Sequence, residues 1–244
     1  MRTVTTIITL TLLTVFTSAN AQFFGNKKVK GNRDITTTHR TTGSYDKISA
    51  RGNIDVLLIE GKEGDITIKA ESNFMEYIVT ETRENTLVIK VKNGVSLRPS
   101  RNKNIEVTVP YRDITAVSVS GSGKVEGESA IKSDTFKTKV SGSGDVILSI
   151  NANVVEAAVS GSGDISLTGT TTIFKAKVSG SGDVEADSLK AKEVYAAVSG
   201  SGDISANATN LINGKVMGSG DITYSGSPQK RDTKVSGSGS IRSK

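Results

Sequence analysis

The sequence predicts an all-β protein in which a β-solenoid of stacked parallel coils follows a less regular N-terminal β portion. The first observation is a seven-residue repeat, Val-Ser-Gly-Ser-Gly-Asp-Ile in its most regular form. Seven copies, 18 to 21 residues apart, begin at Val119, Val140, Val159, Val178, Val198, Val216 and Val235. A unit of about 19 residues cannot bury its own apolar face, so repeats of this period stack on their neighbours.

The second observation is a two-residue alternation within each coil, which is typical of extended chain with one buried face. Around the third copy the apolar or small positions are Val155, Ala157, Val159, Gly161, Gly163, Ile165 and Leu167. Stacked coils align such positions into columns. One inward column is expected to contain Phe136, Val155, Phe174, Val194 and Ile212 and to end in Arg231, a polar cap. The two inward-phased glycines per coil leave two explanations open, a close approach of walls or a positive-φ corner.

Four segments follow from the composition along the chain. Residues 1–21 are predicted to be a cleavable signal peptide, with Arg2, an apolar run and the cleavage motif Ala19-Asn20-Ala21. Residues 22–43 are polar and without period, which indicates a linker or arm. Residues 44–112 form the N-terminal β portion, and residues 113–244 form the solenoid of Ser-Gly-Ser-Gly-Asp repeats. No later segment has the apolar length of a transmembrane helix.

Short β-branched runs between Gly- and Asn-rich turns predict the strands of the N-terminal β portion. These strands are expected at 46–60, 65–70, 76–82, 86–91 and 105–109, with a helical turn over 73–83 as an alternative. A degenerate eighth repeat is expected at Ile48-Ser49-Ala50-Arg51-Gly52-Asn53-Ile54.

These motifs resemble one exported bacterial family. The repeats behind a signal peptide, preceded by the segments Ile48–Val56 and Asp65–Ile68, are similar to the family labelled putative autotransporter adhesin, head GIN domain. The likeness covers Tyr45 to Ile241. It implies a right-handed parallel β-helix-like solenoid and brings no catalytic or cofactor residues.

Composition narrows the compartment and the partners. The chain has no cysteine, which excludes disulfides, thiolate nucleophiles and cysteine-based metal sites. Its net charge is +6, or +5 once the signal peptide with Arg2 is removed. We expect a periplasmic or cell-surface protein whose partners are polysaccharide or envelope proteins. Nucleic acid is not expected, because the basic clusters lack neighbouring aromatic side chains.

Two outward columns are candidate sites. Asp145, Asp164, Asp183, Asp203 and Asp221 form a predicted ladder, in which neighbouring charges repel by about 1 kcal/mol even in water. We expect each aspartate to accept backbone N–H bonds at a corner, with help from Lys139, Lys177 and Lys215; a row of Ca²⁺ sites is the alternative. The second candidate is a hydroxyl binding face formed by Ser141, Ser143, Ser160, Ser162, Ser179, Ser181, Ser199 and Ser201.

Enzyme motifs are incomplete. Gly121-Ser122-Gly123-Lys124 lacks the hydroxyl residue of a phosphate loop, and His39, the one histidine, lies in the polar arm. We therefore expect no catalytic residues and no obligatory cofactor. The sequence favours an exported, non-enzymatic solenoid that binds envelope or extracellular material. A purely structural envelope protein and, third, a carbohydrate-active enzyme are the alternatives.

Overall fold

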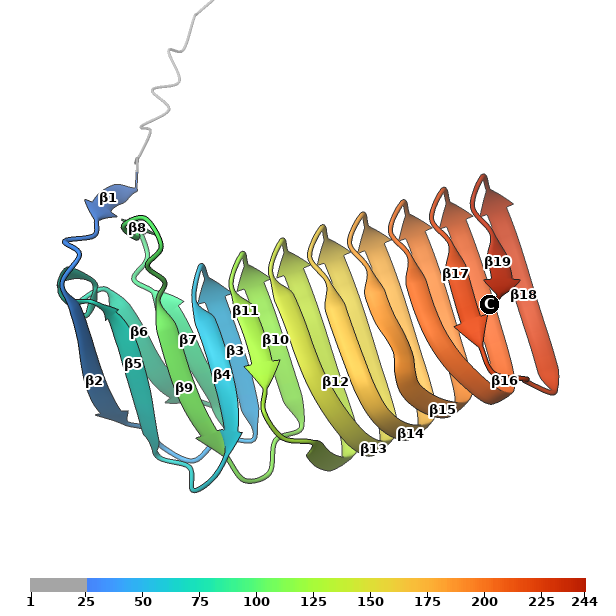
Figure 1. Cartoon of the computed structure of the whole chain (residues 1–244), viewed down its shortest axis with the longest axis horizontal. Helices are drawn as coiled ribbons and strands as arrows, with labels where there is room; N and C mark the ends of the chain where they lie inside the picture. The colour runs from blue at the N-terminus through green and yellow to red at the C-terminus, as the bar shows by residue number, and fades with distance from the viewer. Residues whose placement is uncertain (1–25) are drawn as a thin grey trace, which may run out of the picture.

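The computed structural model describes residues 26–244, so the predicted signal peptide and the start of the predicted arm lie outside the described residues. This part of the chain is almost entirely β-strand, and its one helical element is a 3-10 helix, η1 (Ser72–Phe74). Apart from the pair β1 (Lys27–Lys30) and β8 (Val95–Arg98), the strands stack into one column that runs from β2 (Ile35–Thr41) to β18 (Lys230–Gly237) (Figure 1). Within the same residues, no helix is long and apolar enough to cross a membrane. The predicted all-β solenoid with a less regular N-terminal portion is confirmed.

Long bent strands make up the coils of the solenoid, and each strand continues from one leg of a coil into the other. The central strands are β12 (Ile131–Gly142), β13 (Asp145–Gly161), β14 (Ile165–Gly180), β15 (Val184–Gly200) and β16 (Ile204–Gly218). The first coil contains β10 (Ala116–Gly121) and β11 (Lys124–Gly127), and the last coils contain β17 (Ile222–Ser225), β18 (Lys230–Gly237) and β19 (Ile241–Ser243). Neighbouring coils pair in parallel, with Val140 beside Val159 and Val159 beside Val178.

The predicted inward column lies at the centre of the core. Its members Phe136, Val155, Phe174, Val194 and Ile212 are all fully buried. Burying each phenylalanine contributes about 2 to 3 kcal/mol. Arg231, the residue of this column in the last coil, is exposed, and its guanidinium lies 5.8 Å from the centre of the Tyr224 ring. The polar cap that the sequence predicts is therefore present at this end of the stack.

Both explanations for the repeat glycines hold, because one glycine of each pair is a positive-φ corner and the other lies in close backbone contact. That close contact is with the adjacent coil and not with the facing wall of the same coil. The first glycine of each pair is a positive-φ corner, with φ of +132° at Gly161 and +139° at Gly180. A Cβ on the second glycine would strike backbone of the preceding coil, since at Gly163 it would lie 2.0 Å from the Gly144 carbonyl oxygen. Neither position can hold a side chain without moving a neighbouring coil.

The N-terminal portion contains one more parallel coil before its strands become antiparallel. β3 (Lys47–Gly52) and β4 (Asp55–Glu60) pair in parallel with β10 and β11, and also with β7 (Thr86–Val91) and β9 (Glu106–Tyr111). β5 (Asp65–Glu71) and β6 (Ile78–Arg83) join antiparallel to β9 and β7. Residues 73–83, proposed alternatively as a helical turn, begin in η1, form a turn at 75–77 and continue as β6.

The position of the degenerate eighth repeat was wrong by two residues. The register places Ala50 beside Val119 and Gly52 beside Gly121, so the copy begins at Ala50 and not at Ile48. A shift of two residues leaves every side chain on the same face of a strand, so the alternation alone cannot distinguish the two alignments.

The prediction of a linker or arm at residues 22–43 was also wrong for the part that the structure describes. β1 (Lys27–Lys30) pairs in parallel with β8 (Val95–Arg98), a strand that the sequence analysis did not predict. β2 (Ile35–Thr41) pairs antiparallel with β5 at the end of the stack opposite β18 (Figure 1). Threonine is polar but β-branched, and it suits a half-exposed strand that covers a sheet edge.

Side chains of β2 fix it to the β portion. Arg40 donates hydrogen bonds to the carbonyl oxygens of Ile78, at 2.6 Å, and Met75, at 2.7 Å. The ring Nδ1 of His39 hydrogen-bonds with the Thr67 hydroxyl at 3.1 Å. The only histidine of the chain is thus part of a strand pairing.

A buried carboxylate joins the first strands to the loop after β8. Glu71 is 1% exposed and accepts hydrogen bonds from the backbone N–H of Arg33 at 2.5 Å and of Ser100 at 2.9 Å, and from the Ser100 hydroxyl at 2.6 Å. Burial raises the pKa of Glu71, but the bonds from Ser100 and Arg33 and the nearby Lys103 charge outweigh it, so the pKa lies below its ordinary value.

Candidate functional site

The aspartates of the repeat form a ladder of hydrogen bonds along one corner of the solenoid. The Oδ1 atom of each carboxylate accepts the backbone N–H of the aspartate in the next coil. From Asp145 to Asp164, Asp183, Asp203 and Asp221, the successive N–H to Oδ1 distances are 3.3, 2.8, 2.7 and 2.7 Å. Every step places an N–H dipole against the negative charge below it, which offsets the repulsion between carboxylates.

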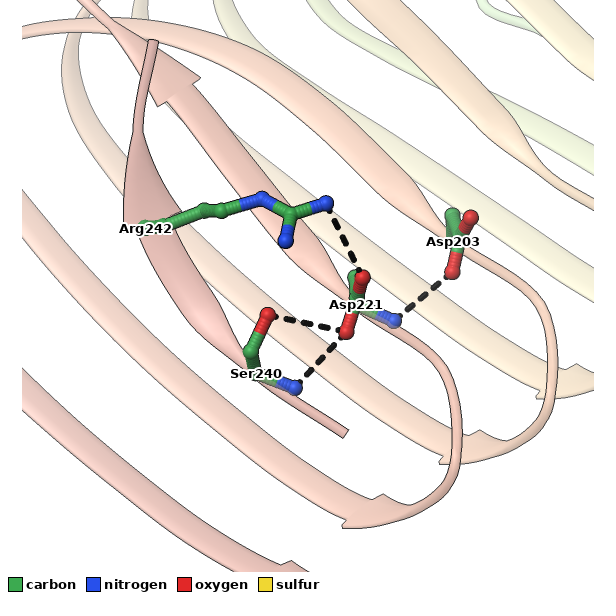
Figure 2. Close-up of polar contacts among 4 residues, drawn as sticks. All are labelled: Asp203, Asp221, Ser240 and Arg242. Carbon is green, nitrogen blue, oxygen red and sulfur yellow. Dashed lines mark hydrogen bonds and ion pairs between the residues drawn. The ribbon is translucent and has the colours of Figure 1, made fainter. Parts of the chain in front are cut away.

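The ladder continues beyond the five predicted residues at both ends. In the preceding coil Asp55 Oδ1 accepts the N–H of Lys124 at 3.1 Å. Lys124 interrupts the series, because it has no carboxylate to receive the next N–H. At the other end Asp221 Oδ1 accepts the N–H and the hydroxyl of Ser240, at 2.7 and 2.9 Å, and its Oδ2 lies 3.2 Å from Arg242 (Figure 2). The Ser240 bonds, with the Arg242 charge, lower the pKa of Asp221.

This geometry agrees with the expectation that the aspartates accept backbone N–H bonds, although the donor belongs to the next coil and not to the same turn. The expected help from Lys139, Lys177 and Lys215 is not observed, because in residues 26–244 none of these lysines pairs with a ladder carboxylate. Among these residues no group of three or more His, Cys, Asp or Glu side chains is placed to hold a metal ion. Ca²⁺ binding stays a prediction.

The serines form two columns on either side of the positive-φ glycines. In the first column Ser141, Ser160, Ser179 and Ser199 lie side by side in register, and Met217 takes the position in the following coil. The second column, Ser143, Ser162, Ser181 and Ser201, lies in the tight turns and is exposed. The backbone N–H of each turn serine donates to a glycine of the preceding coil, as from Ser162 to Gly142 at 2.8 Å. The sequence correctly groups the two sets as neighbours, but a corner separates them.

A lysine-rich outer face precedes this corner, and the sequence analysis did not identify it. Register aligns the outward residues two positions before the first serine column as Lys139, Ala158, Lys177, Ala197 and Lys215, called here the lysine–alanine column, and Lys234 takes the same position beside Lys215 in the last coil. The adjacent column contains Lys137, Glu156, Lys175 and Tyr195. Each member of the lysine–alanine column directly precedes a repeat valine, so aligning the repeats in the sequence could have revealed it.

Glu156 organises the cations beside this column. Its carboxylate pairs with Lys137 at 3.0 Å and with Lys175 at 3.3 Å, and these two ammonium groups lower its pKa. Lys139, Lys177 and Lys215 are exposed, and in the described chain no carboxylate pairs with them. The face therefore presents uncompensated positive charge.

A hollow of about 460 Å³ lies among these side chains. Ala157, Ala158 and Ala176 contribute to its lining, together with Thr138, and Glu156 and the lysines at 137, 139, 175 and 177 complete it. In the next coil Tyr195 is 38% exposed, and its hydroxyl donates to Glu193 at 3.0 Å.

Comparisons with known proteins agree with this architecture. A putative adhesin from Bacteroides fragilis has 26% identity and a TM-score of 0.80, over 88% of this chain and 100% of that protein. A putative lipid binding protein from Parabacteroides distasonis has 24% identity and a TM-score of 0.74, over 89% and 100%. A putative adhesin from Parabacteroides merdae has 20% identity and a TM-score of 0.71, over 89% and 99%.

A search of curated proteins gave no match. The family model described as "Putative auto-transporter adhesin, head GIN domain" matches residues 44–228, most of the chain. Its span includes the N-terminal β portion and the solenoid through β17. The chain belongs to this family.

Proposed function

We propose that this protein is an exported, adhesin-like binding protein that attaches to polysaccharide or to a surface protein through the outer faces of its solenoid. The observation that carries the proposal is the in-register repetition of exposed polar side chains on a continuous parallel sheet. Equivalent groups recur at about 4.8 Å from coil to coil. A rigid array of this kind suits a ligand that is itself periodic or extended.

The environment of the aspartates supports a non-enzymatic role. Acid–base catalysis uses two groups whose surroundings differ. The aspartates of the ladder instead share one environment, since each Oδ1 accepts a backbone N–H from the next coil. Their arrangement serves the stacking of coils.

Export through the N-terminal signal sequence is part of the same proposal. The apolar run and the motif Ala19-Asn20-Ala21 support it, and the family description fits an exported protein. The protein would then act in the periplasm or at the cell surface. A structural envelope role without a dedicated ligand is the alternative.

A binding screen tests the proposal. The chain from Gln22 to Lys244 is applied to arrays of neutral polysaccharides, acidic polysaccharides and matrix proteins, once with calcium and once with chelator. We expect saturable binding to one class. Binding that disappears in chelator would assign metal to the aspartate ladder. Absence of binding in both conditions would favour the structural role, and turnover of any polysaccharide would contradict the non-enzymatic assignment.

A further inference from the structure

We propose that the lysine–alanine column binds a linear acidic polysaccharide in which a charged sugar alternates with a neutral one. This inference rests on the proposed adhesin-like function and adds to it the ligand class and the face that binds. Charge, spacing and the hollow beside the column carry the argument.

The lysines of the column that have no carboxylate partner among the described residues are regularly spaced. Over five successive coils, lysine occupies every second one, from Lys139 through Lys177 to Lys215, with Ala158 and Ala197 between them; the last coil adds Lys234 directly beside Lys215. Coils stack at about 4.8 Å, so the lysines recur at about 10 Å along the stack. A polymer with an acidic group on alternate sugars can place one carboxylate at each lysine in turn.

Small apolar side chains, the alanines, separate the lysines along the column. Ala158 forms part of the floor of the 460 Å³ hollow, and lysines from the coils on both sides stand at its rim. A small apolar floor between two cations accepts the neutral ring of a sugar while its charged neighbours reach the ammonium groups. A lysine in place of Ala158 would instead fill this space and place like charges at three successive coils.

The flanking column holds the arrangement in place. Glu156 pairs with Lys137 and Lys175 from the coils on either side, and within residues 26–244 no carboxylate pairs with Lys139 or Lys177. In the next coil Tyr195 extends the face with an exposed ring whose hydroxyl is bonded to Glu193. A fixed aromatic ring provides an apolar surface for the C–H face of a sugar.

The same features argue against nucleic acid as the ligand. Duplex DNA carries one phosphate per about 3.4 Å along each strand, and proteins bind single strands by stacking successive bases on several aromatic rings. From Lys139 to Lys215 this column offers one cation per about 10 Å, and in the aligned neighbouring column of the described strands the aromatic side chain is Tyr195. Its charge density matches a more sparsely charged polymer.

The experiment measures binding of the chain from Gln22 to Lys244 to hyaluronan, which has a carboxylate on every second sugar. Dextran is the neutral comparison, and a single-stranded oligonucleotide is the comparison for dense charge. The test variant combines Lys139→Gln, Lys177→Gln and Lys215→Gln. The matched control removes the same charge at exposed lysines outside this face, with Lys132→Gln, Lys190→Gln and Lys192→Gln.

We expect saturable hyaluronan binding that weakens about tenfold or more in the test variant and less than threefold in the control, because three ion pairs are lost only in the former. Ala158→Leu, which fills the hollow without changing charge, is expected to weaken binding as well. Equal losses in both triple variants, or equally strong binding to dextran or the oligonucleotide, would overturn the inference. Binding elsewhere in the polysaccharide and protein arrays without hyaluronan binding would overturn it and leave the adhesin-like function standing, whereas no binding at all would refute both.

Discussion

Replacing Gly163 with alanine tests whether crowding between coils explains the repeat glycines. The new Cβ would lie 2.0 Å from the carbonyl oxygen of Gly144, and contacts below 3.0 Å essentially never occur for this atom. The coil must therefore retreat by about 1 Å along the stack. The hydrogen bonds that Ser162 and Gly163 donate to Gly142 measure 2.8 and 3.0 Å, so they would lengthen to roughly 3.8 and 4.0 Å and be lost.

The expected cost follows from these two effects. Overpacking contributes about 1 to 3 kcal/mol, and the two lost hydrogen bonds contribute about 1 kcal/mol each. Gly163→Ala should therefore lower the free energy of unfolding by about 3 to 5 kcal/mol. Gly94→Ala is the matched control, because Gly94 has φ of +74° and no atom lies within 4 Å of an added Cβ. Alanine in this left-handed conformation costs about 1 to 2 kcal/mol, so Gly94→Ala should be less destabilising than Gly163→Ala.

Urea unfolding followed by far-ultraviolet circular dichroism measures both variants, since the chain has no tryptophan for fluorescence. The slopes of the transitions are compared first, because a repeat protein can lose its cooperative unfolding. If Gly163→Ala is no more destabilising than Gly94→Ala at equal slopes, the steric explanation of the repeat is wrong.

Three further changes test other parts of the structure. Thr138→Val should raise the free energy of unfolding by about 1 kcal/mol in urea titration, because the buried Thr138 hydroxyl has no hydrogen-bond partner in the described chain; a decrease would show that the hydroxyl is satisfied. Asp183→Ala should lower the melting temperature by about 3 °C, since the N–H of Asp203 loses a carboxylate acceptor at 2.7 Å. An unchanged melting temperature would show that the aspartate ladder does not stabilise the stack. The low pKa of Glu71 means that its contribution to stability is complete above about pH 4.3 and is lost as pH falls through the folded-state pKa. Glu71→Gln should therefore flatten unfolding free energy against pH in that acidic window, and an unchanged profile would contradict the assignment.

The repeat phase predicted the core because inward positions depend only on alternation within a strand. Phe136, Phe174 and the columns around them are buried as expected. The first strands were not predicted, because the inward and outward positions of β2 are mostly threonines and so show no apolar/polar alternation. β2 is also held by contacts with residues distant in the sequence, such as the bond from Arg40 to the carbonyl oxygen of Ile78. Propensity and pattern give little indication of a strand that covers an edge.

The candidate sites were predictable to different degrees for a similar reason. The aspartate ladder follows from identical residues at identical repeat positions, although the N–H donor from the next coil depends on the stagger of the stack. The lysine–alanine column contains different residues in successive coils. Each of them directly precedes the valine of its repeat, so an alignment of the repeats would have located the column, but without identical residues it gave no repeat signature.

The most direct test of the binding face is a lysine footprint. The lysines of the protein are acetylated with and without saturating hyaluronan, and mass spectrometry measures the extent of modification at each lysine. We expect protection of Lys139, Lys177 and Lys215 and unchanged modification of Lys190 and Lys192. Protection confined to the latter pair, or spread equally over all five, would contradict the claim that the lysine–alanine column is where this solenoid binds its ligand.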